Sequence, residues 1–195
     1  MAKNRIIYQS QSVYAGPSAT SGSYVHETGV VSTTSKAKPA PLQRVQNVNY
    51  SFDIARTDVN QFGQLANIDR IILDSPTVSM DFSYYLANFG NEKKMGFHIM
   101  GDATLASCVS GMLNRTSDER NYYIRVASDG QDSVGDATTG TGTNDVIGIG
   151  NGFMSSYSSD ASVGDFPTAS ITVEALNIAF DKGMTGNTCP NVNPV

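Results

Sequence analysis

The most regular stretch of the chain alternates apolar and polar side chains over residues 77–86. Apolar residues stand at every second position, and the positions between them hold Thr77, Ser79, Asp81, Ser83 and Tyr85. A polar, glycine-containing segment at 88–94 then separates this run from apolar residues at 95–100. Because successive side chains of a strand point to opposite faces, the pattern predicts a β-hairpin with one packed face and one face in water.

A second alternation covers residues 43–54. Val48, Tyr50, Phe52 and Ile54 fall on one face, and the other face carries Asn47, Asn49, Ser51 and Asp53. This predicts another strand with one wet face.

Further strands are predicted at residues 122–127, 145–163 and 168–180, with a turn at 164–167. In the last strand the apolar residues change from one parity to the other, which predicts a β-bulge near Glu174 or Ala175. Two helical segments are also expected. One is a short helical turn within 57–65, and the other is an amphipathic helix over 102–114 whose natural N-cap is Asp102.

The composition favours a mainly β protein. The chain has 195 residues, enough for one sizeable core, and only 16 % of them are charged. Small polar residues and glycines fill the gaps between the apolar runs, which is typical of short strands joined by turns. We expect three segments: an extended N-terminal arm at 1–42, a β domain at 43–180 and an irregular tail at 181–195. No stretch approaches the ~20 apolar residues needed to span a bilayer.

Charge and reactive residues argue against several functions. The formal net charge is −5, and the basic stripe of a protein that grips nucleic acid is missing. With only two histidines and no nucleophile elbow, no catalytic triad can be assembled, so we expect no enzyme and no cofactor. Cys108 and Cys189 are interpreted as free thiols.

Two binding functions were weighed against simpler interpretations. Loop carboxylates could hold Ca²⁺, but their spacing fits no known calcium loop, so a solvated loop without metal is the preferred interpretation for Asp129, Asp132 and Asp136. Aromatic residues could form a carbohydrate platform, although aromatics that alternate along strands usually belong to the core: Tyr84, Tyr85, Phe89, Tyr122 and Tyr123.

The segments 44–65, 77–86 and 150–178 together resemble the tail tube, or major tail, proteins of tailed bacteriophages. The resemblance lies in R-V-Q-N-V-N-Y-S-F-D-I-A-R-T-D-V-N-Q-F-G-Q-L, in T-V-S-M-D-F-S-Y-Y-L and in G-N-G-F-M-S-S-Y-S-S-D-A-S-V-G-D-F-P-T-A-S-I-T-V-E-A-L-N-I. It implies an antiparallel β-sandwich or half-barrel with one flanking helix and a long hairpin. It also implies a virion protein that forms stacked hexameric rings around a shared inner β-barrel, through which DNA is ejected.

Simple geometry agrees with such an assembly. A bore for duplex DNA roughly 20 Å wide needs a backbone barrel of about 40 Å, or on the order of 20 to 26 strands at ~4.8 Å spacing. About six copies with four lining strands each would supply them and leave no exposed sheet edge. A polar, acidic lining would let DNA slide without sticking, and its candidates are Asn47, Asn49, Asp53, Ser79, Asp81, Asp160 and Glu174.

The predicted hairpin tip is a candidate contact with the next subunit or ring, through Asn88, Phe89, Asn91, Glu92, Lys93 and Lys94. Expected partners are further copies of the chain, passing double-stranded DNA, and the sheath, baseplate, tape-measure and tail-terminator proteins of a virion tail. Two alternatives remain at this point: a β-sandwich carbohydrate-binding or adhesion module, and a baseplate or terminator protein of the same fold.

Overall fold

The computed structural model describes residues 11–17, 39–59, 62–63, 69–72, 76–97, 119–127, 133, 143–185 and 192. Its strands and helix are, in chain order, β1 (Gln11–Pro17), β2 (Ala40–Pro41), β3 (Val45–Asp53), β4 (Arg56–Val59), β5 (Asp69–Ile72), β6 (Thr77–Tyr85), α1 (Gly90–Met95), β7 (Arg120–Val126), β8 (Thr143–Asp160), β9 (Thr168–Ala175) and β10 (Asn177–Thr185). The mainly β fold expected from the composition is confirmed.

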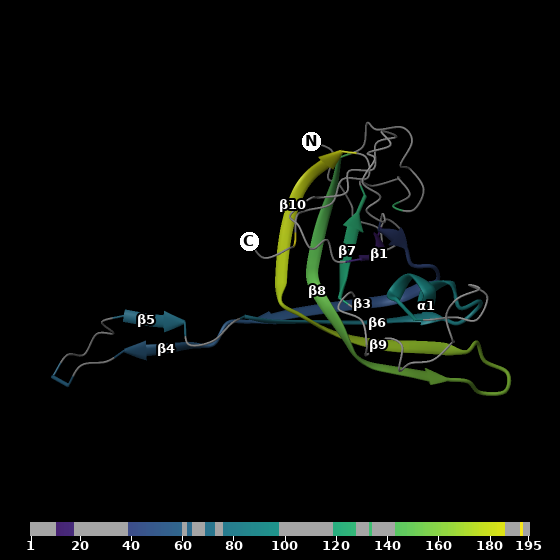
Figure 1. Ribbon diagram of the computed structural model, residues 1–195, viewed down its shortest axis with the longest axis horizontal. Coiled ribbons are helices and arrows are strands. Elements are labelled where there is room, and N and C mark those ends of the chain that lie inside the picture. The colour runs from purple at the N-terminus through teal and green to yellow at the C-terminus, as the bar shows by residue number, and fades with distance from the viewer. Residues whose placement is uncertain are drawn as a thin grey trace, which may run out of the picture.

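The strands form two antiparallel layers that share one long strand, β8 (Figure 1). Residues 143–152 of β8 pair with β7 and β10, whereas residues 153–160 pair with β9. We call the layer β2-β1-β7-β8-β10 sheet A and the layer β8-β9-β6-β3 sheet B. The two layers run across each other, and the bend of β8 forms the corner between them, as in orthogonal sheet packing.

The core lies between the two layers. The alternation predicted for residues 77–86 is confirmed in β6, whose inward side chains Val78, Met80, Phe82 and Tyr84 are at most 2 % exposed. They pack beside buried residues of β9, namely Ala169, Ile171 and Val173, and across from Tyr122 and Ile149 of sheet A. Full burial of each large apolar side chain contributes about 1.5–3 kcal/mol to stability, so this contact is the main source of cohesion.

The prediction that β6 pairs with the segment that follows it in a hairpin is wrong. After Tyr85 the chain forms helix α1 instead of a hairpin tip, and β6 pairs with β3 and β9. The physical reason is that Asn91, Glu92 and Met95 share one side of a helical turn, and all three are buried. Gly96 then ends the helix in a left-handed conformation (φ 104°), and the N–H of Phe97 bonds to the carbonyl of Glu92 at 3.0 Å.

The helical turn expected within 57–65 is also wrong for the residues described there. Residues 56–59 form strand β4, which continues the line of β3 and pairs with β5. The two strands form an arm that projects beyond the body of the molecule (Figure 1). The pairing partner Asp69–Ile72 supplies the backbone hydrogen bonds that a helical turn would have made internally.

The apolar residues were predicted to change from one alternating set of positions to the other near Glu174, and this change occurs at Leu176. This residue is a bend between β9 and β10, where the chain leaves sheet B and enters sheet A. The side chains on either side of the bend belong to two different layers, so the apolar positions change parity without a bulge at Glu174 or Ala175.

Both ends of the described chain contribute to sheet A. Strand β1 pairs along its length with β7 and buries Val13 and Ala15, so this part of the segment expected to be an extended arm belongs to the sheet. Val192 is buried beside Gly150, and its carbonyl accepts a hydrogen bond from the Asn177 side chain at 3.0 Å. The helix predicted at 102–114 lies outside the described residues. Among the described residues, no helix has the length and apolar character that crossing a membrane requires.

Helix α1 is fastened to sheet B and to the connection between β2 and β3 by polar contacts. The carboxylate of Glu92, which is 3 % exposed, accepts hydrogen bonds from Tyr84 Oη at 2.6 Å and Tyr157 Oη at 3.2 Å through the same oxygen. Asn91 bonds the backbone of Gln43 in both directions, at 2.9 Å and 2.8 Å. The helix therefore holds the connection between β2 and β3 against sheet B.

Replacing Glu92 by alanine should destabilise the protein by about 2–3 kcal/mol, because the buried phenol of Tyr84 and the half-buried phenol of Tyr157 lose their acceptor. Glu92→Gln keeps an acceptor oxygen at that place and should lose much less. Urea unfolding followed by circular dichroism measures both variants. Equal losses would mean that the carboxylate charge, and not hydrogen-bond acceptance, is what matters there.

Buried tyrosines should also make the fold sensitive to alkali. Burial raises the pKa of Tyr84 and of Tyr122 above the ordinary value of 10.0, and the Glu92 carboxylate raises that of Tyr84 further. A raised folded-state pKa gives stability that is complete below about pH 10 and is lost as the pH rises above it. We expect the urea midpoint to fall between about pH 10 and 12, and to fall less in Tyr122→Phe. An identical fall in that variant would contradict the contribution of Tyr122.

Candidate functional site: the polar face of sheet B

The register of sheet B brings polar residues of four strands onto one face. Residues that stand directly opposite each other in a sheet point to the same side, so the pairing itself defines the face. One row across the sheet is Asn49, Asp81, Thr172 and Ser156, and the next is Asn47, Ser83, Ser170 and Ser158. The neighbouring row towards the arm is Ser51, Ser79, Glu174 and Phe153.

All seven residues proposed from the sequence as lumen candidates lie on this face. Asp53 pairs with Thr77 at the arm end, and Asp160 pairs with Thr168 at the opposite end. The five others occupy the three rows described above. Six of the seven are exposed and Ser79 is half-buried, whereas the alternate residues of β6 and β9 form the core.

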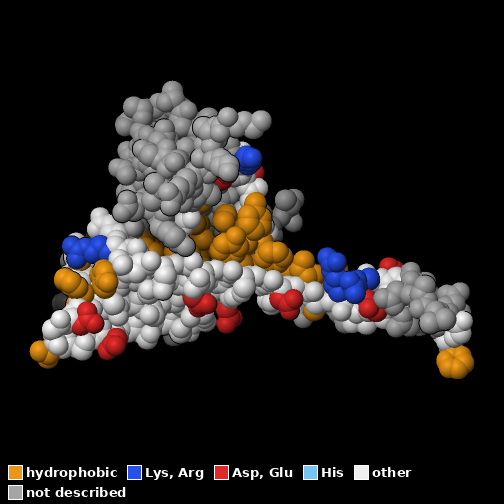
Figure 2. All heavy atoms as spheres, turned by 180° about the vertical axis from the view of Figure 1, so that it is seen from behind, with side chains coloured by type: hydrophobic (Ala, Val, Ile, Leu, Met, Phe, Trp, Pro, Cys, Tyr) orange, Lys and Arg blue, Asp and Glu red, His pale blue; other side chains and the backbone are white. Residues whose placement is uncertain are grey.

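The charge of this face has one sign. It carries the carboxylates of Asp53, Asp81, Asp160 and Glu174, and none of the described residues paired in register on this face is Lys or Arg. The space-filling view shows acidic side chains scattered along the lower surface, whereas the basic ones lie above it and on the arm (Figure 2). The face would therefore repel phosphate groups.

Many polar groups of the face are bonded to one another across the strands. The hydroxyl oxygens of Ser51 and Ser79 are 2.7 Å apart, and the Asn47 side-chain oxygen accepts from the hydroxyl of Ser83 at 2.8 Å and from its N–H at 3.1 Å. Because these side chains bond to one another across the strands, fewer of their donors are available to a molecule that lies against the face.

Sheet B is open at both lateral edges. Within the described chain, β3 pairs only with β6, and residues 153–160 of β8 pair only with β9. Each edge presents backbone N–H and C=O groups that can pair with another strand. All neighbouring strands of the sheet are antiparallel, so β3 of one copy and β8 of another would also meet antiparallel.

The residues proposed as subunit contacts belong to α1 and the turn before it. Asn91 and Glu92 are buried and bonded within the chain, as described above. Lys94 donates to the carbonyl of Pro41 at 2.6 Å, and partial burial lowers its pKa. Asn88, Phe89 and Lys93 are exposed, with Phe89 at 65 %. Only these three remain as surface candidates.

The other chemistries weighed from the sequence find little support in the described residues. Tyr84, Tyr122 and Tyr123 are buried, whereas Tyr85 is half-buried and Phe89 is exposed, so the five aromatic residues do not form one exposed platform. No group of three metal-binding side chains gathers in the part of the chain that the structure describes. The three loop aspartates, the two histidines and the two cysteines lie outside it.

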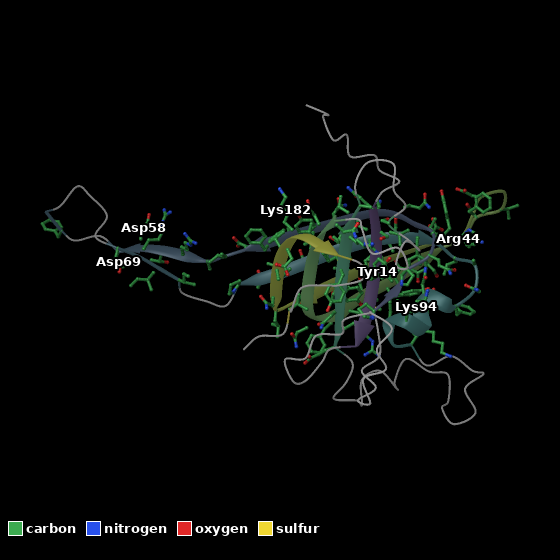
Figure 3. All side chains as sticks on the ribbon, turned by 90° about the horizontal axis from the view of Figure 1, so that it is seen from above. Tyr14, Arg44, Asp58, Asp69, Lys94 and Lys182 are labelled. Carbon is green, nitrogen blue, oxygen red and sulfur yellow. The ribbon has the colours of Figure 1, made fainter. Side chains whose placement is uncertain are left out.

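The arm formed by β4 and β5 was not expected from the sequence. All eight of its paired residues are exposed, including Ile71 (48 %) and Ile72 (56 %). Arg70 and Asp58 form an exposed ion pair at 2.6 Å, which links the two strands. Asp58 and Asp69 lie on the arm at one end of the molecule, whereas Arg44 and Lys94 lie at the other (Figure 3).

Comparison with known proteins identifies the fold. No model of a known protein family matches the chain, and no curated protein sequence matches it. The structure of the SPP1 tail tube matches with a TM-score of 0.51 and 10 % sequence identity, over 92 % of this chain and 80 % of that one. The chain therefore has the fold of a phage tail tube protein, as the resemblance in the sequence implied.

Two further matches concern related assemblies. A chain of the anti-feeding prophage tube-terminating cap has a TM-score of 0.49 at 11 % identity, over 94 % of this chain and 95 % of that one. A chain of the PVC sheath-tube complex, from an extracellular contractile injection system, has a TM-score of 0.47 at 14 % identity, over 91 % and 92 %.

Proposed function

We propose that this chain is a structural, non-enzymatic subunit of a virion tail, which self-assembles into stacked hexameric rings and forms a tube for the ejection of DNA. The single observation that carries the proposal is the polar face of sheet B. Between Phe153 at one end and Tyr85 at the other, four strands present a hydrophilic surface whose described paired residues include no Lys or Arg, and both edges of the sheet are open to further strands in the described chain. Strands of other copies could satisfy such open edges.

The strand count supports six copies. Sheet B supplies four strands, so six copies supply about 24, within the 20 to 26 needed for a barrel that admits duplex DNA. Pairing β3 of one copy with β8 of the next would continue the antiparallel order and satisfy the backbone groups at both edges. The ring would then leave no open edge in its inner wall.

The charge of the face supports a conduit and argues against a DNA-binding role. Four carboxylates in each of six copies give about 24 negative groups facing the bore. Tight binding of DNA requires that phosphates be neutralised by Lys or Arg, and this wall would do the opposite. DNA could pass through it without being held.

The exposed arm supports contacts beyond a single ring. It extends the line of β3 and β6 past the end of the body and carries apolar side chains with no cover in the described chain. Together with Asn88, Phe89 and Lys93 at the opposite end, it offers surfaces to neighbouring copies and to sheath, baseplate, tape-measure and tail-terminator proteins.

Negative-stain microscopy of the purified protein tests the assembly. We expect rings or tubes with a central hole and sixfold end views, because sheet B has two edges that are open in the described chain and could pair with other copies. Sedimentation velocity provides the matching measurement of mass. A protein that stays monomeric at every concentration would contradict the proposal.

Replacing Asp81 by lysine should leave assembly intact and make the bore retain DNA, because about six cations replace six carboxylates in its central row. The measurement is the amount of short duplex DNA that cosediments with tubes and is protected from nuclease. Retention should fall steeply as salt is raised.

Asp181→Lys is the matched control, since it makes the same charge change on β10 of sheet A. DNA attracted to that variant should stay open to nuclease. Equal protection in both variants, or none in Asp81→Lys tubes, would mean that Asp81 does not face the bore.

A further inference from the structure

The polar face of sheet B ends in apolar side chains at both of its ends. At the arm end, Phe153 (45 % exposed) stands opposite Glu174 in the register, and Leu176 (58 % exposed) follows at the bend. At the other end, Tyr85 stands opposite Thr168, and its ring lies 5.6 Å from that of Phe166, which is 72 % exposed. The rows between these two ends are polar.

The arm end is hollowed where the strands part. Strand β9 leaves sheet B at Leu176, whereas β3 and β6 continue towards the arm. An open groove of about 780 Å³ results. Its apolar side is formed by Phe153, Leu176 and Pro76, and its polar side by Ser51, Thr77 and Ser79.

The opposite end projects instead. The turn between β8 and β9 is the extremity of the body away from the arm (Figure 1). Gly164, with φ 93°, allows the tight reversal, and Val163 and Phe166 stand out from it with 108 % and 72 % exposure. One end of the face thus carries an apolar projection and the other a groove with an apolar side.

We propose that these two ends meet between copies stacked head to tail, so that Tyr85 and Phe166 of one copy pack against Phe153 and Leu176 of the next. This inference rests on the proposed function and names the contact that joins successive rings at the bore. The occupant is a second copy, because the two surfaces are apolar, lie at opposite ends of one sheet and differ in shape. A contact between unlike surfaces at the two ends of the sheet can repeat along one axis without closing, which is what a tube requires.

Charge opposes this contact. Asp53 and Glu174 flank the groove, while Asp160 and Asp165 lie at the projecting end. Stacking brings these carboxylates towards one another, so the apolar contact must outweigh a repulsion that salt screens. Ring stacking should therefore strengthen as ionic strength rises, which is opposite to the behaviour of an interface held by ion pairs.

The test is the ratio of tubes to single rings for Phe166→Ser and Leu176→Ser, measured by sedimentation velocity and negative-stain microscopy at 50 mM and 500 mM salt. Each variant should still form rings, and each should raise the concentration needed for tube growth at least tenfold, because a large apolar side chain loses its cover. Phe180→Ser is the matched control, since it removes a ring of 57 % exposure from sheet A. Its ratio of tubes to rings should equal that of the wild type.

Tubes that form as readily in both variants as in the wild type, or that shorten as salt is raised, would overturn the inference and leave ring formation standing. A wild-type protein that forms no rings would instead overturn the proposed function. The two failures are therefore distinguishable in the same experiment.

Discussion

The pairing of β6 with β3 on one side and β9 on the other is the constraint on which the rest of the structure depends. It aligns three strands so that every inward residue of β6 meets core neighbours and every outward residue meets polar ones. A slip of one residue would bury Asp81 and expose Phe82, so the apolar packing holds the register fixed. The polar face is thus a consequence of the core. Asp81 and Glu174 keep their places because their buried apolar neighbours along the strand cannot move.

The polar face could be predicted from the sequence because the alternation of apolar and polar residues along each strand is kept in the folded sheet. Asn49, Asp81 and Glu174 could be assigned to one face before their strands were known to be neighbours, since each stands between apolar residues of its own strand. The identity of neighbours could not be obtained in this way: β6 was expected to pair with the segment that follows it, whereas its partners come from both sides in the sequence.

The remaining features depend on contacts that local pattern does not contain. Helix α1 has only six residues, and its burial of Glu92 depends on two tyrosine hydroxyls from different strands. The bend that lets β8 serve two sheets is marked by a register shift and by Asn151 at φ 53°, neither of which alternation predicts. Strand β1 looked like part of a polar arm because only Val13 and Ala15 of its short span face the core. In each case the deciding interaction joins residues that are distant in the sequence.

The polar face restricts the type of residue at each position more than its identity. The proposed role of the face requires small hydrophilic side chains at alternate positions and an excess of carboxylates, and a serine, threonine or asparagine satisfies that demand equally well at most positions. Selection acting on such a surface would preserve a period and a sign of charge while leaving the identity of each residue free to drift. A fold maintained in this manner can be shared with the SPP1 tail tube at 10 % identity.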